Sequence, residues 1–235
     1  MAETLYIVIP AYNEEENIKA VVEDWYPIVD KYGDDSRLVI VNDGSKDSTY
    51  ETMLGLKEGR EKFIPLTKEN GGHGATILYG YKYAIENGAD YVFQTDSDGQ
   101  TLPSEFEQFW NKRTENDVTI GYRNHREDGF SRVIVTKVLK MVVKICFKES
   151  ITDANTPYRL MKAGVLAEDI KEVPDGFFLS NVLLTVLFKK HGRKMEFIPI
   201  TFRPRQGGVN SINIKRIIKI GRQAVKDFRE LNKKI

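Results

Sequence analysis

Short apolar runs alternate with longer segments of helical periodicity through the first half of the chain. The apolar runs predict strands over residues 5–9, 37–41, 63–66, 91–93 and 118–120. Between them, the spacing of apolar positions predicts helices over residues 14–30, 48–59 and 74–87. The apolar residues of each strand are continuous rather than alternating, which is typical of parallel strands buried on both faces. The pattern therefore predicts an α/β fold, a mostly parallel sheet with helices on both faces.

The second half of the chain is less regular. It predicts helices over residues 131–148 and 177–190, a strand over residues 195–200, and a loop near Asp153. A basic helix follows from about residue 213 to the end. We expect one large α/β domain over residues 1–210 and a C-terminal basic amphipathic helix within residues 211–235.

Capping residues indicate where the first two helices begin. Asn13 with Glu16, and Ser48 with Glu51, match the pattern in which a capping side chain is followed three residues later by a glutamate. Both starts lie just beyond the carboxyl end of a predicted strand. Open α/β sheets bind their ligands at that edge, so the loops near these caps are candidate site segments.

Two aspartates separated by one residue, Asp96 and Asp98, follow the apolar run over residues 91–93. Carboxylates this close repel each other unless a cation or a hydrogen-bond donor lies between them. A hard divalent cation that also binds substrate phosphates would meet this need. The alternative is a surface turn, because Asp-Ser-Asp-Gly is a favourable turn sequence.

Acidic residues also follow the first two strands, within residues 10–14 and 42–45. Asp43 could accept a hydrogen bond from a nucleobase ring N–H, and Tyr12 could offer a flat face to the base. The alternative for each segment is a helix-capping turn. Three strand ends with acidic residues on one edge of the sheet are harder to explain by capping alone.

Glycines surround the predicted start of the third helix, in residues 70–74. Glycine at a helix start lets the backbone approach a ligand closely, so this loop could hold a phosphate. The glycine spacing is not that of a dinucleotide-binding fingerprint, and no Gly-Lys-Ser/Thr follows as a P-loop would require. The sequence thus disfavours a Rossmann-type oxidoreductase.

Composition narrows the function classes. Hydrophobic residues make up 41% of the 235 residues, enough for a substantial core. The formal net charge is +1, so no overall field attracts nucleic acid. A single cysteine, Cys146, rules out an internal disulfide and a cysteine-rich metal site. No basic segment leads into an apolar one at the start, and no run approaches the ~20 apolar residues of a membrane span, so we expect a cytoplasmic protein.

In order and spacing, the segments 9–14, 41–49, 70–74 and 96–100 resemble glycosyltransferase family 2, which has the GT-A fold. The resemblance implies that Asp98 ligates Mg²⁺ or Mn²⁺ on the donor diphosphate, and that Asp96 contacts the ribose or the metal. The residues implied to bind the nucleotide part of the donor are Pro10, Ala11, Tyr12, Glu14, Asp43, Asn70 and Gly72. Arg123 is a candidate phosphate or acceptor contact. Arg205 and Ser211 match the family's phosphate-binding loop, where Ile212 replaces a lysine.

Within the family, the single-domain branch that includes dolichol-phosphate mannose synthase is the most similar. Residues 153–159 resemble that branch's D-x-x-x-G-F-R motif, with Pro157 in place of the glycine. Many family members carry a general base near residues 180–182, where this chain has Ser, Asn and Val. A hydroxyl acceptor needs a base, whereas a phosphate is already an anionic nucleophile. The lack of a carboxylate at residues 180–182 favours a lipid phosphate acceptor. The alternative is that Asp153 or Asp175 serves as the catalytic base.

Two helices carry lysines and arginines on one side. Residues 137, 140, 144 and 148 are lysines within roughly an 80° arc, which suits contact with anionic lipid. The last helix has a similar basic set: Lys215, Arg216, Lys219, Arg222 and Lys226. The alternative is that both are solvated faces of helices that pack on the core.

These observations predict an inverting glycosyltransferase that acts from the cytoplasm at the inner face of the cell membrane. Its donor would be a nucleotide-diphosphate sugar (UDP or GDP), and its acceptor a polyprenyl phosphate or a lipid-linked glycan. Peripheral membrane contact, or a separate membrane protein partner, would bring the two together. The rival hypothesis is a regulatory protein of the same fold that binds nucleotide sugars without transferring the sugar.

Overall fold

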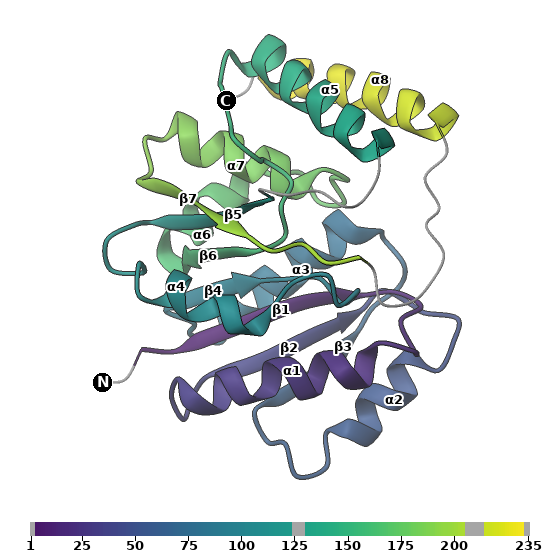
Figure 1. Cartoon of the computed structure of the whole chain (residues 1–235), viewed down its shortest axis with the longest axis vertical. Helices are drawn as coiled ribbons and strands as arrows, with labels where there is room; N and C mark the ends of the chain where they lie inside the picture. Colours follow the sequence, from purple (N-terminus) through teal and green to yellow (C-terminus); the bar gives the residue numbers. More distant parts are fainter. Residues whose placement is uncertain (1–2, 124–129, 205–213, 233–235) are drawn as a thin grey trace.

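The computed structural model describes residues 3–123, 130–204 and 214–232. Its core is a seven-stranded sheet with the strand order β3-β2-β1-β4-β6-β5-β7 (Figure 1). The strands are β1 (Leu5–Ala11), β2 (Arg37–Asn42), β3 (Phe63–Thr67), β4 (Tyr91–Gln94), β5 (Val118–Arg123), β6 (Arg159–Lys162) and β7 (Met195–Ile200). All neighbouring strands are parallel except β6, which is antiparallel to both β4 and β5. The predicted α/β class with a mostly parallel sheet is confirmed.

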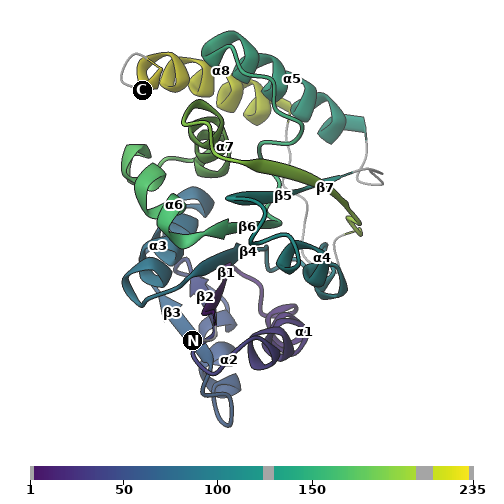
Figure 2. The ribbon, with the colours of Figure 1, turned by 90° about the vertical axis from the view of Figure 1, so that its left-hand side faces the viewer.

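Helices cover both faces of this sheet (Figure 2). The helices are α1 (Ile18–Lys31), α2 (Thr49–Leu56), α3 (His73–Glu86), α4 (Phe106–Trp110), α5 (Phe130–Phe147), α6 (Ala163–Asp169), α7 (Ser180–Lys190) and α8 (Ile214–Leu231), with 3₁₀ turns η1 (Pro103–Glu105) and η2 (Ile170–Glu172). In Figure 2, α1 and α4 lie on one side of the sheet and α3 and α6 on the other. Helices α5 and α8 pack against each other and form a further layer outside α7.

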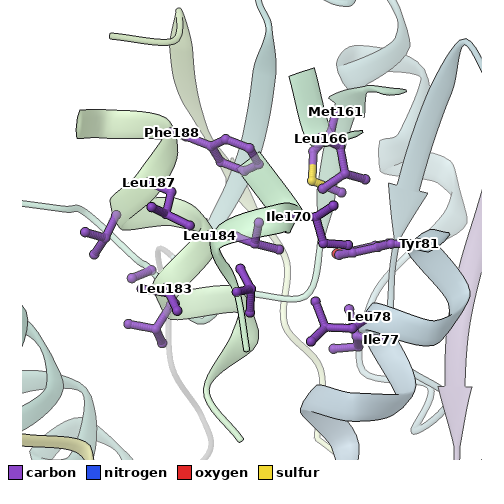
Figure 3. Close-up of a cluster of buried hydrophobic side chains, with 14 of the residues drawn as sticks. Ile77, Leu78, Tyr81, Met161, Leu166, Ile170, Leu183, Leu184, Leu187 and Phe188 are labelled. Carbon is purple, nitrogen blue, oxygen red and sulfur yellow. The ribbon is translucent and has the colours of Figure 1, made fainter. Parts of the chain in front are cut away.

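Two hydrophobic clusters, one on each face, explain why the strands are apolar at every position. Along β1, Ile7 and Ile9 belong to the cluster beneath α1, whereas Tyr6 and Val8 belong to the cluster beneath α3. The second cluster continues between α3 and α7, where Leu183, Leu184 and Leu187 lie near Ile77, Leu78 and Tyr81 (Figure 3). Full burial of each such aliphatic side chain stabilises the fold by about 1.5–3 kcal/mol. This packing fixes the carboxyl ends of the parallel strands, where the polar loops lie.

Strand β6 is an element that the sequence pattern does not predict. It inserts between β4 and β5, so Gln94 of β4 and Ile120 of β5 both pair with Arg159. The strand has only four residues, and charged residues at both ends flank Leu160 and Met161. No continuous apolar run therefore marks it. The segment before β6 is the predicted loop near Asp153.

The prediction that Asn13 caps the first helix is wrong, whereas Ser48 does take the N-cap position of α2 but without the predicted side-chain hydrogen bond. Helix α1 begins at Ile18, and neither helix has a side-chain hydrogen bond from its N-cap residue. Asn13 instead adopts a left-handed conformation (φ 52°), which asparagine tolerates, and its Oδ1 accepts from the Lys46 N–H at 2.9 Å. The Ser48 N–H donates to Glu15 Oε2 at 3.0 Å. These two hydrogen bonds join the loop after β1 to the loop after β2. The Asn13 side-chain oxygen that was expected to cap a helix is satisfied by this contact between the loops.

Candidate nucleotide and metal site

A pocket of about 370 Å³ lies at the carboxyl ends of β1, β2, β3 and β4. It brings together most of the residues expected to hold the donor or the metal: Pro10, Ala11, Tyr12, Glu14, Asp43, Asn70, Gly72, Asp96 and Asp98. The rest of its lining is His73, Thr76, Ser97 and Phe178, to which the sequence assigned no role. The pocket is therefore formed by the four loops whose motifs were singled out, together with Thr76 of α3 and Phe178 from the segment before α7.

Asp43 organises the glycine loop beside the pocket. Its Oδ1 accepts from Lys68 Nζ at 2.7 Å and from the Gly71 N–H at 2.9 Å, and its Oδ2 accepts from the Gly72 N–H at 2.8 Å. Burial alone would raise the pKa of Asp43, but the hydrogen bonds from Lys68 and Gly71 outweigh it and lower the pKa. The carboxylate is ionised, and much of its accepting capacity holds the loop in place.

The loop that carries Asp43 lies directly against the glycine loop. Gly44 has φ 64°, and a Cβ at this position would lie 3.0 Å from the Asn70 nitrogen. The Asn70 side chain also donates to the Asp43 carbonyl at 2.8 Å. A side chain at position 44 would thus be strained by its backbone conformation and would crowd this contact.

Asp96 and Asp98 lie beyond the end of β4 at Gln94, on a loop closed by a 2.6 Å hydrogen bond between the Thr95 and Thr101 hydroxyls. Asp96 Oδ1 is buried and accepts no hydrogen bond from the residues that the structure describes. His73 Nε2 lies 3.7 Å from this oxygen, beyond hydrogen-bond range. Asp98 Oδ1 accepts from the Gln100 N–H at 3.2 Å.

An unsatisfied buried carboxylate oxygen beside a second carboxylate fits a divalent cation. Among the described residues, no group of three or more His, Cys, Asp or Glu side chains is arranged to hold a metal alone. Two aspartates suit Mg²⁺ or Mn²⁺ when substrate phosphates and water supply the other ligands. The residues present are therefore compatible with such a cation.

Asp153 and Arg123 pair with each other away from the pocket lining. Arg123 Nε and Nη2 donate to the two Asp153 oxygens at 3.0 and 3.1 Å, and both side chains are largely buried. The Arg123 guanidinium also lies 5.1 Å from the centre of the Phe202 ring. A bidentate pair of this kind neutralises both charges.

Asp175 also lies outside the pocket lining. Its side chain is 87% exposed, and its Oδ1 lies 2.6 Å from Lys82 Nζ on α3. Hydrogen bonding and charge attraction from Lys82 lower the pKa of Asp175. Arg205 and Ser211, the remaining predicted phosphate contacts, lie outside the described residues.

Gly74, at the start of α3, lets another part of the chain approach. A Cβ at Gly74 would lie 2.1 Å from the Phe177 carbonyl oxygen and 2.8 Å from that of Phe178. The sequence suggested that glycines here admit a ligand. For Gly74 the close approach belongs to the segment before α7, and this is how Phe178 reaches the pocket.

A mostly parallel sheet, helices on both faces and acidic loops at the carboxyl ends of its central strands define the GT-A fold. The chain belongs to glycosyl transferase family 2, whose family model matches residues 6–168. Glucosyl-3-phosphoglycerate synthase from Mycobacterium tuberculosis, solved with Mn²⁺ and uridine-diphosphate-glucose, has the same fold: the TM-score is 0.72 at 16% identity, covering 97% of this chain and 79% of that one.

The similarity to individual relatives covers more of the chain than the family model does. The undecaprenyl-phosphate 4-deoxy-4-formamido-L-arabinose transferase of Pectobacterium atrosepticum is 24% identical over 217 residues, which is 91% of this chain. The matched region spans only 64% of that relative's length. An uncharacterized protein of Methanocaldococcus jannaschii is 26% identical over 231 residues, covering 93% of this chain and 96% of the relative.

Proposed function

We propose that this protein is an inverting glycosyltransferase that moves a sugar from a nucleoside diphosphate sugar to the phosphate of a polyprenyl lipid. The observation that carries the proposal is the pocket, which combines the Asp43-anchored glycine loop with the Asp96–Asp98 pair. The first can hold a nucleoside, and the second fits a cation on a diphosphate. The name of the Pectobacterium relative, which includes undecaprenyl phosphate, supports the lipid phosphate as acceptor.

The residues of the pocket divide the work of transfer. The segment from Pro10 to Glu14 and Asp43 hold the nucleoside, while Asp96 and Asp98 hold Mg²⁺ or Mn²⁺. When bound, the cation neutralises charge that develops on the departing diphosphate. The acceptor phosphate attacks the anomeric carbon from the side opposite the diphosphate, which inverts the configuration. Pre-positioned groups are effective here because they need no reorganisation as the charge develops.

Neither Asp153 nor Asp175, the two carboxylates predicted as bases, belongs to the pocket lining, which agrees with an acceptor that needs no base. Asp153 is neutralised by Arg123, and Asp175 is held by Lys82 outside the pocket lining. A lipid phosphate brings its own negative charge, so proton removal adds nothing. A lipid-linked glycan would attack through a hydroxyl and would need one of these carboxylates to move.

A transfer assay tests the proposal. Thermal-shift measurements with UDP- and GDP-sugars in the presence of Mn²⁺ would identify the donor. The purified protein would then be given that donor and undecaprenyl phosphate in detergent micelles. Formation of the lipid-phosphate sugar supports the proposal. Donor binding without transfer to any acceptor would favour the regulatory alternative.

Asp175→Asn should leave turnover within about tenfold of the unmodified enzyme, because a phosphate acceptor needs no general base. Loss of a true general base would instead lower the rate by ~10²–10⁴-fold. Steady-state transfer to undecaprenyl phosphate measures this effect. Lys82→Gln is the matched control, since it breaks the same ion pair without removing the carboxylate. A collapse of turnover in Asp175→Asn alone would identify Asp175 as a base and point to a hydroxyl acceptor.

We further propose that α5 contacts the membrane surface where the acceptor lies. The buried side of α5 includes Val142, Val143, Cys146 and Phe147, and the Phe147 ring lies 5.1 Å from Phe228 of α8. The exposed side carries Val138, Met141 (56% exposed) and Ile145 (61% exposed).

Lys140 and Lys144 are also exposed, on the same side of the helix as these apolar residues, and Lys148 is exposed just beyond the end of α5. Apolar and basic residues together on an exposed helical face suit an anionic bilayer surface. No helix within the described part of the chain has the length and apolar content to cross a bilayer.

Replacing Lys137, Lys140 and Lys144 with Glu should release the protein from anionic liposomes. Each basic residue near such a surface contributes about 1 kcal/mol, so losing three reduces binding by roughly two orders of magnitude or more. Co-sedimentation with phosphatidylglycerol-containing liposomes at low salt measures the change. The matched control replaces three exposed lysines elsewhere with Glu: Lys19, Lys31 and Lys57. Equal release by both triple variants would show that overall charge, and not α5, governs binding.

A further inference from the structure

A short segment before α7, residues 174–179, is attached to α3 near both of its ends; we refer to it as the strap. Near its start, Asp175 pairs with Lys82 of α3 at 2.6 Å. Farther along, the carbonyls of Phe177 and Phe178 lie against Gly74 so closely that any side chain at position 74 would displace them. Just beyond the strap, the Ser180 hydroxyl donates to the Phe177 carbonyl at 2.5 Å. The strap is therefore held at a fixed place beside the pocket.

Phe177 and Phe178, neighbours on the strap, have different surroundings. The Phe177 ring packs against the second core cluster and lies 5.9 Å from the Phe228 ring of α8. The Phe178 side chain is 55% exposed and lines the pocket together with Asp96 and Asp98. The strap thus contacts α8 on one side and the pocket on the other, and α8 packs beside α5 (Figure 1).

The chemistry of Phe178 limits what it can do in a pocket whose other lining residues are mostly of polar types. A phenylalanine ring can neither ligate a cation nor hydrogen-bond a diphosphate oxygen. Its exposed area is available for an apolar group, and burying that area on binding would be favourable. In a polyprenyl phosphate, the atoms next to the phosphate are hydrocarbon. A phosphate that reaches the sugar near Asp96 and Asp98 would bring this hydrocarbon to the pocket mouth.

We propose that Phe178 contacts the isoprenoid unit next to the acceptor phosphate and so makes the site select lipid phosphates. This inference rests on the proposed function and adds to it the residue that binds the hydrocarbon part of the acceptor. The strap connects the pocket with the α5–α8 pair. A lipid that leaves a membrane beside α5 would therefore meet Phe178 as its phosphate enters the pocket.

Phe178→Ala tests the inference. It should raise the KM for undecaprenyl phosphate by roughly tenfold or more, because most of the apolar contact area is lost. We expect kcat to stay within about threefold, since the ring touches no reacting atom. In calorimetry with Mn²⁺, Phe178→Ala should bind the nucleoside diphosphate with the same affinity as the unmodified protein. Phe178→Leu keeps an apolar side chain and should restore most of the acceptor affinity.

Tyr79→Ala is the matched control, because Tyr79 is an exposed aromatic residue of α3 (42% exposed) outside the pocket lining. It should leave the KM unchanged. An unchanged KM in Phe178→Ala, or an equal loss of nucleoside diphosphate affinity, would overturn the inference and leave the proposed function intact. If the unmodified protein transfers no sugar to undecaprenyl phosphate from any donor, the proposed function fails and the inference with it.

Discussion

Asp98→Asn should abolish most sugar transfer while leaving the fold unchanged. The substitution keeps the shape of the side chain but removes one of the two negative charges proposed to hold the cation. Such a cation would neutralise the leaving diphosphate, and losing several kcal/mol of that stabilisation corresponds to a rate loss of about 10²-fold or more. The Asp98 Oδ1 hydrogen bond to the Gln100 N–H can be kept by the amide oxygen. The loop should therefore retain its conformation.

Thermal shift separates metal binding from activity in this variant. In the unmodified protein, the nucleoside diphosphate should stabilise the fold more with Mn²⁺ than without it, because a ligand that binds the native state raises its stability. In Asp98→Asn this difference should nearly vanish. Asp24→Asn, which removes an exposed carboxylate of α1, is the matched control and should behave as the unmodified protein. A full Mn²⁺-dependent shift in Asp98→Asn would exclude Asp98 as a metal ligand.

Asp43→Ala should weaken binding of the nucleoside diphosphate by about 1–3 kcal/mol, the cost of leaving buried partners without a charged acceptor. The carboxylate holds the Gly71 and Gly72 N–H groups and the Lys68 ammonium. Without it, the glycine loop loses the contacts that shape one wall of the pocket. Isothermal titration calorimetry with the nucleoside diphosphate measures the loss directly.

Lys68→Met is the appropriate comparison, because it removes the cation and leaves both backbone donors bound to Asp43. We expect a smaller loss of affinity in Lys68→Met than in Asp43→Ala. If Asp43→Ala binds the nucleoside diphosphate as tightly as the unmodified protein, Asp43 acts only as a turn residue. The glycine loop would then owe its conformation to the packing of Gly44 against Asn70.

The sequence predicts the strands around the pocket well because parallel strands buried on both faces must be continuously apolar. Their carboxyl ends lie at one edge of the sheet, so residues such as Asp43 and Asp96, more than fifty positions apart, are expected to meet there. Their common pocket agrees with that expectation. Strand β6 escapes prediction because it is short and is flanked by charged residues.

Side-chain partners were harder to anticipate because they depend on tertiary contacts. Asn13 has the residue type of a helix cap, yet its side-chain oxygen accepts from the Lys46 N–H across two loops. Arg123 has the charge of a phosphate contact, yet Asp153 pairs with it from thirty residues away. Phe178 gives no sequence signal, because its place at the pocket depends on the close approach of the strap to Gly74.

The strand order also bears on how the chain folds during synthesis. Strands β1 to β4 come from residues 5–94 and pair only with one another until β6 joins the edge of β4. The other half closes late, since Val118 of β5 pairs with Met195 of β7. Contacts between distant segments form slowly because loop closure is entropically costly. We therefore expect the half that contains β1 to β4 to form on the ribosome before the edge of β4 gains its antiparallel partner.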